Sequence, residues 1–201
     1  MSENHALLLN TVLPQVYQLK ESRFKILDSI AKKVIIAIQQ DGIANLVFVC
    51  THNSRRSQIA QLSLQLFLQE VGIDKVKVFS CGTEKTHIPT QTQSLFKSLG
   101  LNLESQEDGS IIIDENITLF SKTHEDPSLP PRSIAIMVCD QASEACPFVP
   151  NFNKRVSLEY ADPKYADGSI DEEKAYRKSW NKISTEMAYL SLKLDELMGK
   201  G

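Results

Sequence analysis

The chain has 201 residues, of which 42% are hydrophobic and 23% are charged, and its formal net charge at pH 7 is −3. This content suffices for the buried core of one domain with an appendage, and the slightly acidic balance argues against a nucleic-acid-binding surface. The most apolar early run, at residues 34–38, is far too short to span a bilayer, and the first ten residues lack the basic segment of a signal peptide. We therefore expect a cytoplasmic protein with no membrane association.

Residues 1–43 are predicted to form a helical N-terminal extension. Their apolar residues recur mostly at steps of three and four, which is typical of helices that bury one face. The polar break KESR at residues 20–23 indicates either two helices in a hairpin or one bent helix, and Asp41-Gly42 ends the pattern. The apolar stripe fits either packing against the rest of the chain or dimerisation, and the extension carries no obvious catalytic residue.

A second unit is predicted over residues 44–201, where strand and helix patterns alternate. Apolar-rich runs predict strands at residues 45–50, 75–80, 133–139 and 154–160. Helices are predicted at residues 57–71 and 89–99, and a last helix opens with the capping-box pattern Ser169-x-x-Glu172. Residues 110–120 are apolar and fit either a strand or a buried helix. The alternation predicts an α/β fold with a parallel sheet and helices on both faces.

Cys50 closes the first predicted strand, and the loop that follows it leads through Arg56 into a helix expected to begin near Ser57. Ligands of parallel sheets bind beyond the carboxyl ends of the strands and in front of helix N-termini. The backbone N–H groups of such a loop can point inward and form a nest for a tetrahedral oxyanion. The residues expected to bind this oxyanion are Thr51, His52, Asn53, Ser54, Arg55 and Arg56.

The same C-x5-R spacing suits nucleophilic catalysis by Cys50. The planar guanidinium of Arg56 can hold two oxygens of the anion, and the hydroxyl of Ser57 can donate a hydrogen bond to the sulfur. This positive environment is expected to lower the pKa of the Cys50 thiol and to favour the nucleophilic thiolate at neutral pH. The alternative is that Cys50 is a buried, inert thiol and that the spacing is a coincidence.

Three segments resemble the low-molecular-weight protein tyrosine phosphatase family. VCTHNSRRSQ (residues 49–58) resembles its phosphate-binding loop, FSCGT (79–83) resembles a small-residue segment after its second strand, and ADPKYADG (161–168) resembles its late Asp-Pro loop. The resemblance covers about residue 45 to the end of the chain. It implies a three-layer fold of the phosphotyrosine protein phosphatase I type, in which helices flank a central parallel four-stranded sheet, and it implies that Asp162 is the general acid.

Within that fold, the segment VCDQASEACPFVP (residues 138–150) resembles the thioredoxin-coupled arsenate reductases, in which a C-x6-C-P segment supplies two further redox cysteines. The resemblance implies that Cys50 attacks arsenate and that Cys139 then attacks the adduct, which releases arsenite and leaves a Cys50–Cys139 disulfide. Cys146 then attacks Cys139, and the resulting disulfide is reduced by thioredoxin. The alternative is that Cys139 and Cys146 are ordinary buried thiols.

Several positions depart from the family pattern. His52 lies where glycine is usual, Arg55 lies where a second cysteine is frequent, and Cys81 replaces the usual alanine. Gln61 lies where many reductases carry a glutamate linked to a potassium site, so we expect no bound metal and no tightly bound cofactor. Asn53 matches the family's loop asparagine, whose amide is expected to brace the loop.

Two other functions fit the same residues. A tyrosine phosphatase would use Cys50 as nucleophile and Asp162 as acid on a phosphoester, with Tyr165 as an aromatic wall for the substrate ring. A non-catalytic oxyanion sensor would bind arsenate or phosphate without turnover and dock partners through the N-terminal helices. The additional cysteines Cys139 and Cys146 favour the arsenate reductase over both.

Overall fold

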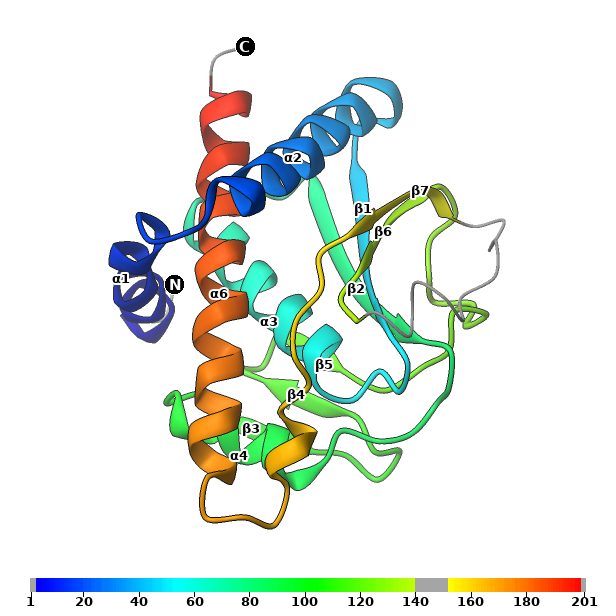
Figure 1. Cartoon of the computed structure of the whole chain (residues 1–201). Helices are drawn as coiled ribbons and strands as arrows, with labels where there is room; N and C mark the ends of the chain where they lie inside the picture. The colour runs from blue at the N-terminus through cyan, green and yellow to red at the C-terminus, as the bar shows by residue number, and fades with distance from the viewer. Residues whose placement is uncertain (1–2, 140–151, 200–201) are drawn as a thin grey trace.

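The computed structural model describes residues 3–139 and 152–199, and its centre is a four-stranded sheet with the strand order β2-β1-β6-β7 (Figure 1). The strands are β1 (Ala44–Cys50), β2 (Val76–Gly82), β6 (Ser133–Met137) and β7 (Phe152–Ser157). All neighbouring pairs are parallel, which confirms the predicted sheet. β1 and β6 lie inside the sheet and are almost entirely buried, as expected for strands covered on both faces.

The described residues form five α-helices around this sheet, namely α1 (Glu3–Val16), α2 (Glu21–Asp41), α3 (Arg56–Glu70), α4 (Thr90–Ser98) and α6 (Glu172–Met198). α3 packs on β1 and β2, whereas α2 packs on β1 and β7. The long helix α6 runs along one side of the molecule and contacts the other four helices (Figure 1). The predicted flanking of the sheet by helices is therefore confirmed.

The ambiguous stretch at residues 110–120 forms strands rather than a helix. β3 (Leu103–Ser105), β4 (Ile111–Ile113) and β5 (Ile117–Leu119) make a small antiparallel sheet. Its side chains alternate, because Ile111, Ile113 and Ile117 are buried while Thr118 is exposed. β4 and β5 are joined by a tight turn in which two successive residues have positive φ angles, and such a turn fits a hairpin.

The N-terminal helices bury their apolar stripe within the same chain. α1 and α2 both pack against α6, and their buried residues join the hydrophobic cluster that surrounds the sheet. On α2 these buried residues are Leu27, Ile30, Ala31 and Val34. Gly42 ends α2 in the left-handed conformation, with φ of 79°, and its N–H group donates to the carbonyl of Ile38. Packing thus accounts for the stripe, and dimerisation stays a prediction.

The start of α6 differs from its prediction. The helix begins at Glu172 rather than after Ser169, so the predicted reciprocal capping box is wrong. The Ser169 hydroxyl donates to the carbonyl of Ala166 at 2.7 Å, and the Glu172 carboxylate accepts from the N–H group of Gly168 at 2.6 Å. Both side chains therefore bond to backbone groups of the turn that precedes the helix instead of capping the helix.

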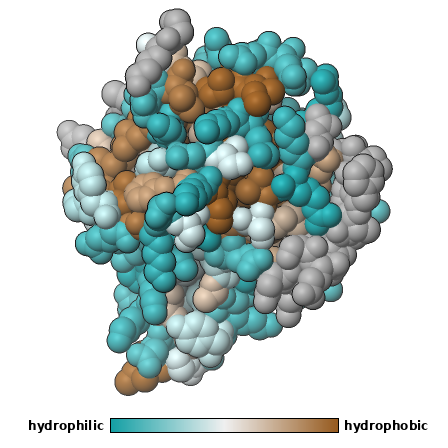
Figure 2. Space-filling model, turned by 45° about the horizontal axis from the view of Figure 1, so that its top comes forward, coloured by the Kyte–Doolittle hydropathy of each residue, from teal (hydrophilic) through white to brown (hydrophobic). Residues whose placement is uncertain are grey.

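The surface of the molecule is mixed in character. On the face shown in Figure 2, hydrophobic side chains are interspersed with hydrophilic ones. Among residues 3–139 and 152–199, no helix combines the length and the apolar character that a membrane span requires.

Replacing Ile30 with alanine is expected to lower the free energy of unfolding by about 2–5 kcal/mol, because a fully buried side chain leaves a cavity in the shared core. Ile36 lies on the same helix but is 41% exposed, so I36A is a matched control expected to cost less than about 1 kcal/mol. Urea denaturation followed by circular dichroism measures both. Equal, small losses would contradict the packing of α2 into the core.

Candidate active site

The sulfur of Cys50 lies at the end of β1, at the start of the predicted anion-binding loop. Its side chain is nearly buried, with 4% of the residue exposed. The hydroxyl oxygen of Ser57 lies 3.0 Å from Cys50 Sγ, and the backbone N–H of Asn53 donates to the same sulfur at 3.2 Å. A thiolate at this position would therefore find two hydrogen-bond donors in place.

The loop between β1 and α3 is held from outside through its carbonyl groups. Four consecutive carbonyl oxygens, those of residues 51–54, each accept at least one hydrogen bond from a neighbouring group. The donors are the N–H of Glu84 and the hydroxyl of Thr83 for Thr51, the hydroxyls of Thr86 and Ser121 for His52, the amide of Gln58 for Asn53, and the hydroxyl of Thr92 for Ser54. With the carbonyls bound outward, the N–H groups of this loop are available to face an anion.

Asn53 stabilises the conformation of this loop. Its backbone has a φ of 46°, a left-handed conformation that asparagine tolerates better than most residues. Its side-chain amide donates to Ser57 Oγ at 2.9 Å, and its amide oxygen accepts from the N–H of Lys122 at 2.9 Å. The fully buried Asn53 thus fixes both the loop and the hydroxyl that contacts the thiol.

Gly82, the last residue of β2, lies directly beneath this loop. A Cβ atom at this position would lie 2.5 Å from the carbonyl oxygen of Thr51 and 2.9 Å from the nitrogen of Asn53. Gly82 is paired in register with Cys50. A residue without a side chain is therefore required here, because the loop backbone occupies the space that a side chain would fill.

Arg56 connects the loop to the segment that carries the predicted acid. Its guanidinium donates to the carbonyl of Tyr160 at 3.0 Å and to Asp162 Oδ2 at 2.6 Å. Asp162 itself precedes the short 3-10 helix η1 (Pro163–Ala166) and also accepts from the N–H of Lys164. The structure thus brings Cys50, Arg56, Ser57 and Asp162 to one edge of the sheet.

Arg55 forms hydrogen bonds with two residues that the sequence did not indicate as its partners. Its guanidinium donates to the hydroxyl of Tyr176 at 2.7 Å and to Asp167 Oδ2 at 2.9 Å, and Tyr176 in turn donates to Asp167. The positive charge of Arg55, one of the residues predicted to bind the oxyanion, is therefore offset by a carboxylate. His52 is partly exposed, and its imidazole lies 3.6 Å from the carboxylate of Glu84. Neither pairing follows a local sequence pattern, because each joins residues far apart in the chain.

The structure contradicts the prediction that the pKa of the Cys50 thiol is lowered. Burial raises the pKa of the Cys50 thiol, and the nearby Cys139 raises it as well, whereas the hydrogen bond with Ser57 and the charge of Arg56 lower it. Burial is the largest of these effects, and it therefore prevails over the hydrogen bond with Ser57 and the charge of Arg56. The site therefore favours the protonated thiol.

Cys139 lies beside the cysteine loop. It follows β6, the neighbour of β1, and is fully buried. Its sulfur lies 3.6 Å from the hydroxyl oxygen of Thr51. Cys81, which replaces the alanine usual in the family, is also fully buried. Cys146 lies outside the described residues.

Lys122 is a buried cation that the sequence did not identify. It is 3% exposed, and its ammonium lies 3.5 Å from the centre of the Phe120 ring. Burial lowers the pKa of Lys122 from 10.5 to about 8. Its backbone N–H supports Asn53, so the residue belongs to the wall behind the cysteine loop.

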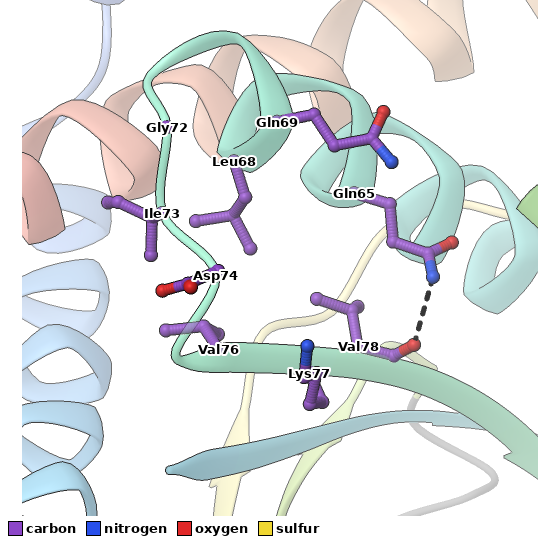
Figure 3. Close-up of a pocket in the computed structure, with 9 residues that line it drawn as sticks. All are labelled: Gln65, Leu68, Gln69, Gly72, Ile73, Asp74, Val76, Lys77 and Val78. Atoms are coloured by element: carbon purple, nitrogen blue, oxygen red, sulfur yellow. Dashed lines mark hydrogen bonds between the residues drawn. The ribbon is translucent and has the colours of Figure 1, made fainter. Parts of the chain in front are cut away.

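A separate cavity lies away from these residues. It has a volume of about 390 Å³ and lies between the end of α3 and the edge strand β2 (Figure 3). The amide of Gln65 reaches across it and donates to the carbonyl of Val78. No residue of the cysteine loop or of the Asp162 segment lines this cavity, so the chemistry is centred elsewhere.

In the described part of the chain, no group of three or more His, Cys, Asp and Glu side chains is arranged to hold a metal ion. Gln61, at the position linked to potassium in many reductases, donates to Gln65 and leaves its own amide oxygen buried without a hydrogen-bond partner.

Cys50 ends a central parallel strand, the loop after it leads into a helix, and an arginine–aspartate pair lies beside that loop. This arrangement is the one expected of an enzyme in which a cysteine attacks an oxyanion. Residues 45–198 match the family of the low molecular weight phosphotyrosine protein phosphatase. Because this match covers most of the chain, the protein belongs to that family. Residues 1–44 lie outside the match.

Curated relatives and solved structures agree with this assignment. The arsenate reductase of Bacillus subtilis (strain 168) is 29% identical over 131 residues, which cover 65% of this chain and 82% of that protein. The arsenate reductase of Halalkalibacterium halodurans is 29% identical over 129 residues, which cover 64% of this chain and 80% of that protein. A low molecular weight phosphotyrosine phosphatase from Vibrio cholerae O395 shares the fold, with a TM-score of 0.52 and 15% identity over 79% of this chain and 99% of its own. An arsenate reductase from Archaeoglobus fulgidus DSM 4304 does so with a TM-score of 0.52 and 20% identity, covering 73% of this chain and 98% of that one.

Replacing Ser57 with alanine is expected to raise the pKa of Cys50 further, because the variant loses a hydrogen bond that stabilises the thiolate. Alkylation of Cys50 by iodoacetamide at neutral pH should become about tenfold slower, as measured by mass spectrometry of the Cys50 peptide. S63A is the matched control, since Ser63 is a buried serine of α3 that donates to the carbonyl of Ile59. Equal rates in S57A and S63A would contradict this role of Ser57.

Replacing Lys122 with methionine is expected to raise the free energy of unfolding at pH 7 by up to about 3 kcal/mol, because the native state holds a desolvated charge. Between pH 8 and 10.5 the unfolded chain binds more protons than the native one, so the free energy of unfolding of the wild type increases with pH. The difference in free energy of unfolding between K122M and the wild type should therefore decrease toward pH 10.5. Urea denaturation at pH 7 and pH 10 measures it, with K77M at an exposed lysine as the control. An advantage that is independent of pH would contradict the buried charge.

Proposed function

We propose that the protein is an arsenate reductase that uses Cys50, Cys139 and Cys146 in a thiol–disulfide relay. The observation that carries the proposal is the position of Cys139, whose sulfur lies 3.6 Å from Thr51 Oγ1 at the mouth of the cysteine loop. Two cysteines thus lie at the ends of neighbouring parallel strands. The identity to proteins named arsenate reductase supports the same chemistry.

In the first step, the Cys50 sulfur attacks arsenic, and a bond from arsenic to a hydroxyl oxygen breaks. The loop N–H groups and Arg56 hold the remaining oxygens. The thiol proton passes to the Asp162 carboxylate, which the anion displaces from Arg56, and Asp162 donates this proton to the departing hydroxyl oxygen, so that one water leaves. Since burial favours the protonated thiol, the proton of Cys50 is given up as the anion arrives.

In the second step, the Cys139 sulfur attacks Cys50 Sγ and forms a disulfide. The electron pair of the sulfur–arsenic bond passes to arsenic, which is reduced from As(V) to As(III), and arsenite takes up the Cys139 proton. In the third step, Cys146 attacks Cys139, so Cys50 returns as a thiol and a Cys139–Cys146 disulfide remains. The two electrons given to arsenic are those lost by two thiols.

Turnover needs an external dithiol, and we assign this role to thioredoxin. Since such reductants are maintained in the cytoplasm, we expect the protein to act there.

Dimerisation through the N-terminal helices is a further prediction.

Phosphotyrosine hydrolysis is the second candidate, because one contact serves it equally well. Asp162, which accepts from Arg56 at 2.6 Å, would act as the acid for a phosphoester leaving group as well as for arsenate. Tyr165 follows Asp162 closely and is 74% exposed, so its ring is available to a phosphotyrosine side chain.

Arsenate-dependent oxidation of NADPH, coupled to thioredoxin and thioredoxin reductase, tests the relay. C146S is expected to release about one equivalent of arsenite per chain and then stop, because Cys50 and Cys139 complete a single turnover without it. C81S is the matched control, since Cys81 is buried and outside the relay, and it should turn over like the native chain.

Unchanged multiple turnover in C146S would remove the three-cysteine mechanism. Aryl phosphate hydrolysis that survives the loss of both Cys139 and Cys146 would favour the phosphatase. Binding of arsenate or phosphate by calorimetry, without turnover of either substrate, would support a non-catalytic oxyanion sensor.

A further inference from the structure

A buried carboxylate on α6 connects the N-terminal extension to the candidate active site. The side chain of Glu186 is 1% exposed, and a charge so far from water needs a close cation and hydrogen-bond donors. Both come from Arg23 in the first turn of α2. Arg23 Nε donates to Glu186 Oε1 at 2.7 Å, and Nη2 donates to Oε2 at 2.5 Å. This two-point contact fixes the orientation of both groups.

Tyr160 is held by the same pair. Its hydroxyl donates to Glu186 Oε2 at 2.6 Å, and the Arg23 guanidinium lies over its ring, 5.1 Å from the ring centre. The residue is 5% exposed, and burial raises the pKa of Tyr160 well above its ordinary value, so the hydroxyl remains a donor. The tyrosine side chain is thus anchored by one residue of the extension and one of α6.

The backbone of Tyr160 reaches the site itself. Its carbonyl accepts from Arg56 at 3.0 Å, and its N–H donates to the carbonyl of Val138, the residue before Cys139. Two residues further on, Asp162 accepts from the other terminal nitrogen of Arg56. A shift of Tyr160 would therefore move both groups that hold the guanidinium of Arg56.

We propose that Arg23 and Glu186 are positioning residues of the active site, which act through Tyr160 on Arg56 and Asp162. The N-terminal extension, which lies outside the family match, thereby supplies part of the support of the catalytic groups. The inference rests on the proposed function, in which Arg56 binds the oxyanion and Asp162 protonates the departing oxygen. Neither Arg23 nor Glu186 takes part in the chemical steps.

A purely structural role would be to hold α2 against α6, and the chain contains a contact that does only this. The hydroxyl of Tyr189 on α6 donates to Asp28 Oδ1 on α2, also at 2.6 Å. Tyr189 and Tyr160 each lose one hydrogen bond to a carboxylate when replaced by phenylalanine. The Tyr189 contact does not include the backbone that binds Arg56, which makes Y189F a matched control for Y160F.

The experiment compares Y160F with Y189F, and R23Q with D28N, in the full-length chain. Melting temperatures and circular dichroism establish that each variant is folded. Y160F and R23Q are expected to reduce kcat for arsenate and to weaken the protection of Cys50 from alkylation by arsenate, each by about three- to tenfold. Y189F and D28N are expected to leave kcat, KM and protection within a factor of two of the native values. If R23Q does not fold, the two tyrosine variants decide the question.

Equal effects of Y160F and Y189F on kcat and on protection, or no effect of Y160F on either, would overturn the proposal. The two proposals can fail separately. If the native chain reduces no arsenate, the proposed function fails, while arsenate protection of Cys50 still reports on Arg56. A difference between Y160F and Y189F in that protection would then support the positioning role alone.

Discussion

Everything in the site depends on where the carbonyl groups of the loop after β1 are directed. Residues 51–54 each give their carbonyl oxygen to a donor in the surrounding scaffold, and the buried amide of Asn53 ties the loop back to Ser57. A peptide unit that binds outward through oxygen presents its N–H on the opposite side, so these contacts leave backbone donors for the oxyanion of the proposed function. The absence of a side chain at Gly82 is what allows the loop to lie so close to the sheet.

The same enclosure affects the nucleophile. A sulfur that is nearly shielded from water is protected from adventitious oxidation but is harder to ionise, and in this site burial prevails over Ser57 and Arg56. In the proposed mechanism, attack by Cys50 therefore depends on the transfer of its proton to Asp162 when the anion binds. Such a thiol differs from the exposed, permanently ionised cysteines of many redox sensors.

The sequence predicted those features that depend on local pattern. The buried strand β1 and the helix α3 follow from local apolar patterns, and both lie within one residue of the predicted ranges. The features that it did not predict join residues far apart in the chain: Arg55 with Asp167, Glu186 with Arg23, and Lys122 behind the loop. The predicted direction of the Cys50 pKa shift was wrong for a related reason. A C-x5-R spacing places an arginine near the sulfur, but it does not indicate that an aspartate more than one hundred residues later takes up the guanidinium.

The contact between Arg56 and Asp162 has a consequence for which anions the enzyme admits. An anion that binds the guanidinium of Arg56 must displace the Asp162 carboxylate, which already accepts from it at 2.6 Å. A singly charged ion such as chloride replaces one negative charge with another and gains little, whereas a doubly charged tetrahedral anion brings more charge and more acceptor atoms. In the proposed function, the resting ion pair thus favours doubly charged anions over monovalent ones.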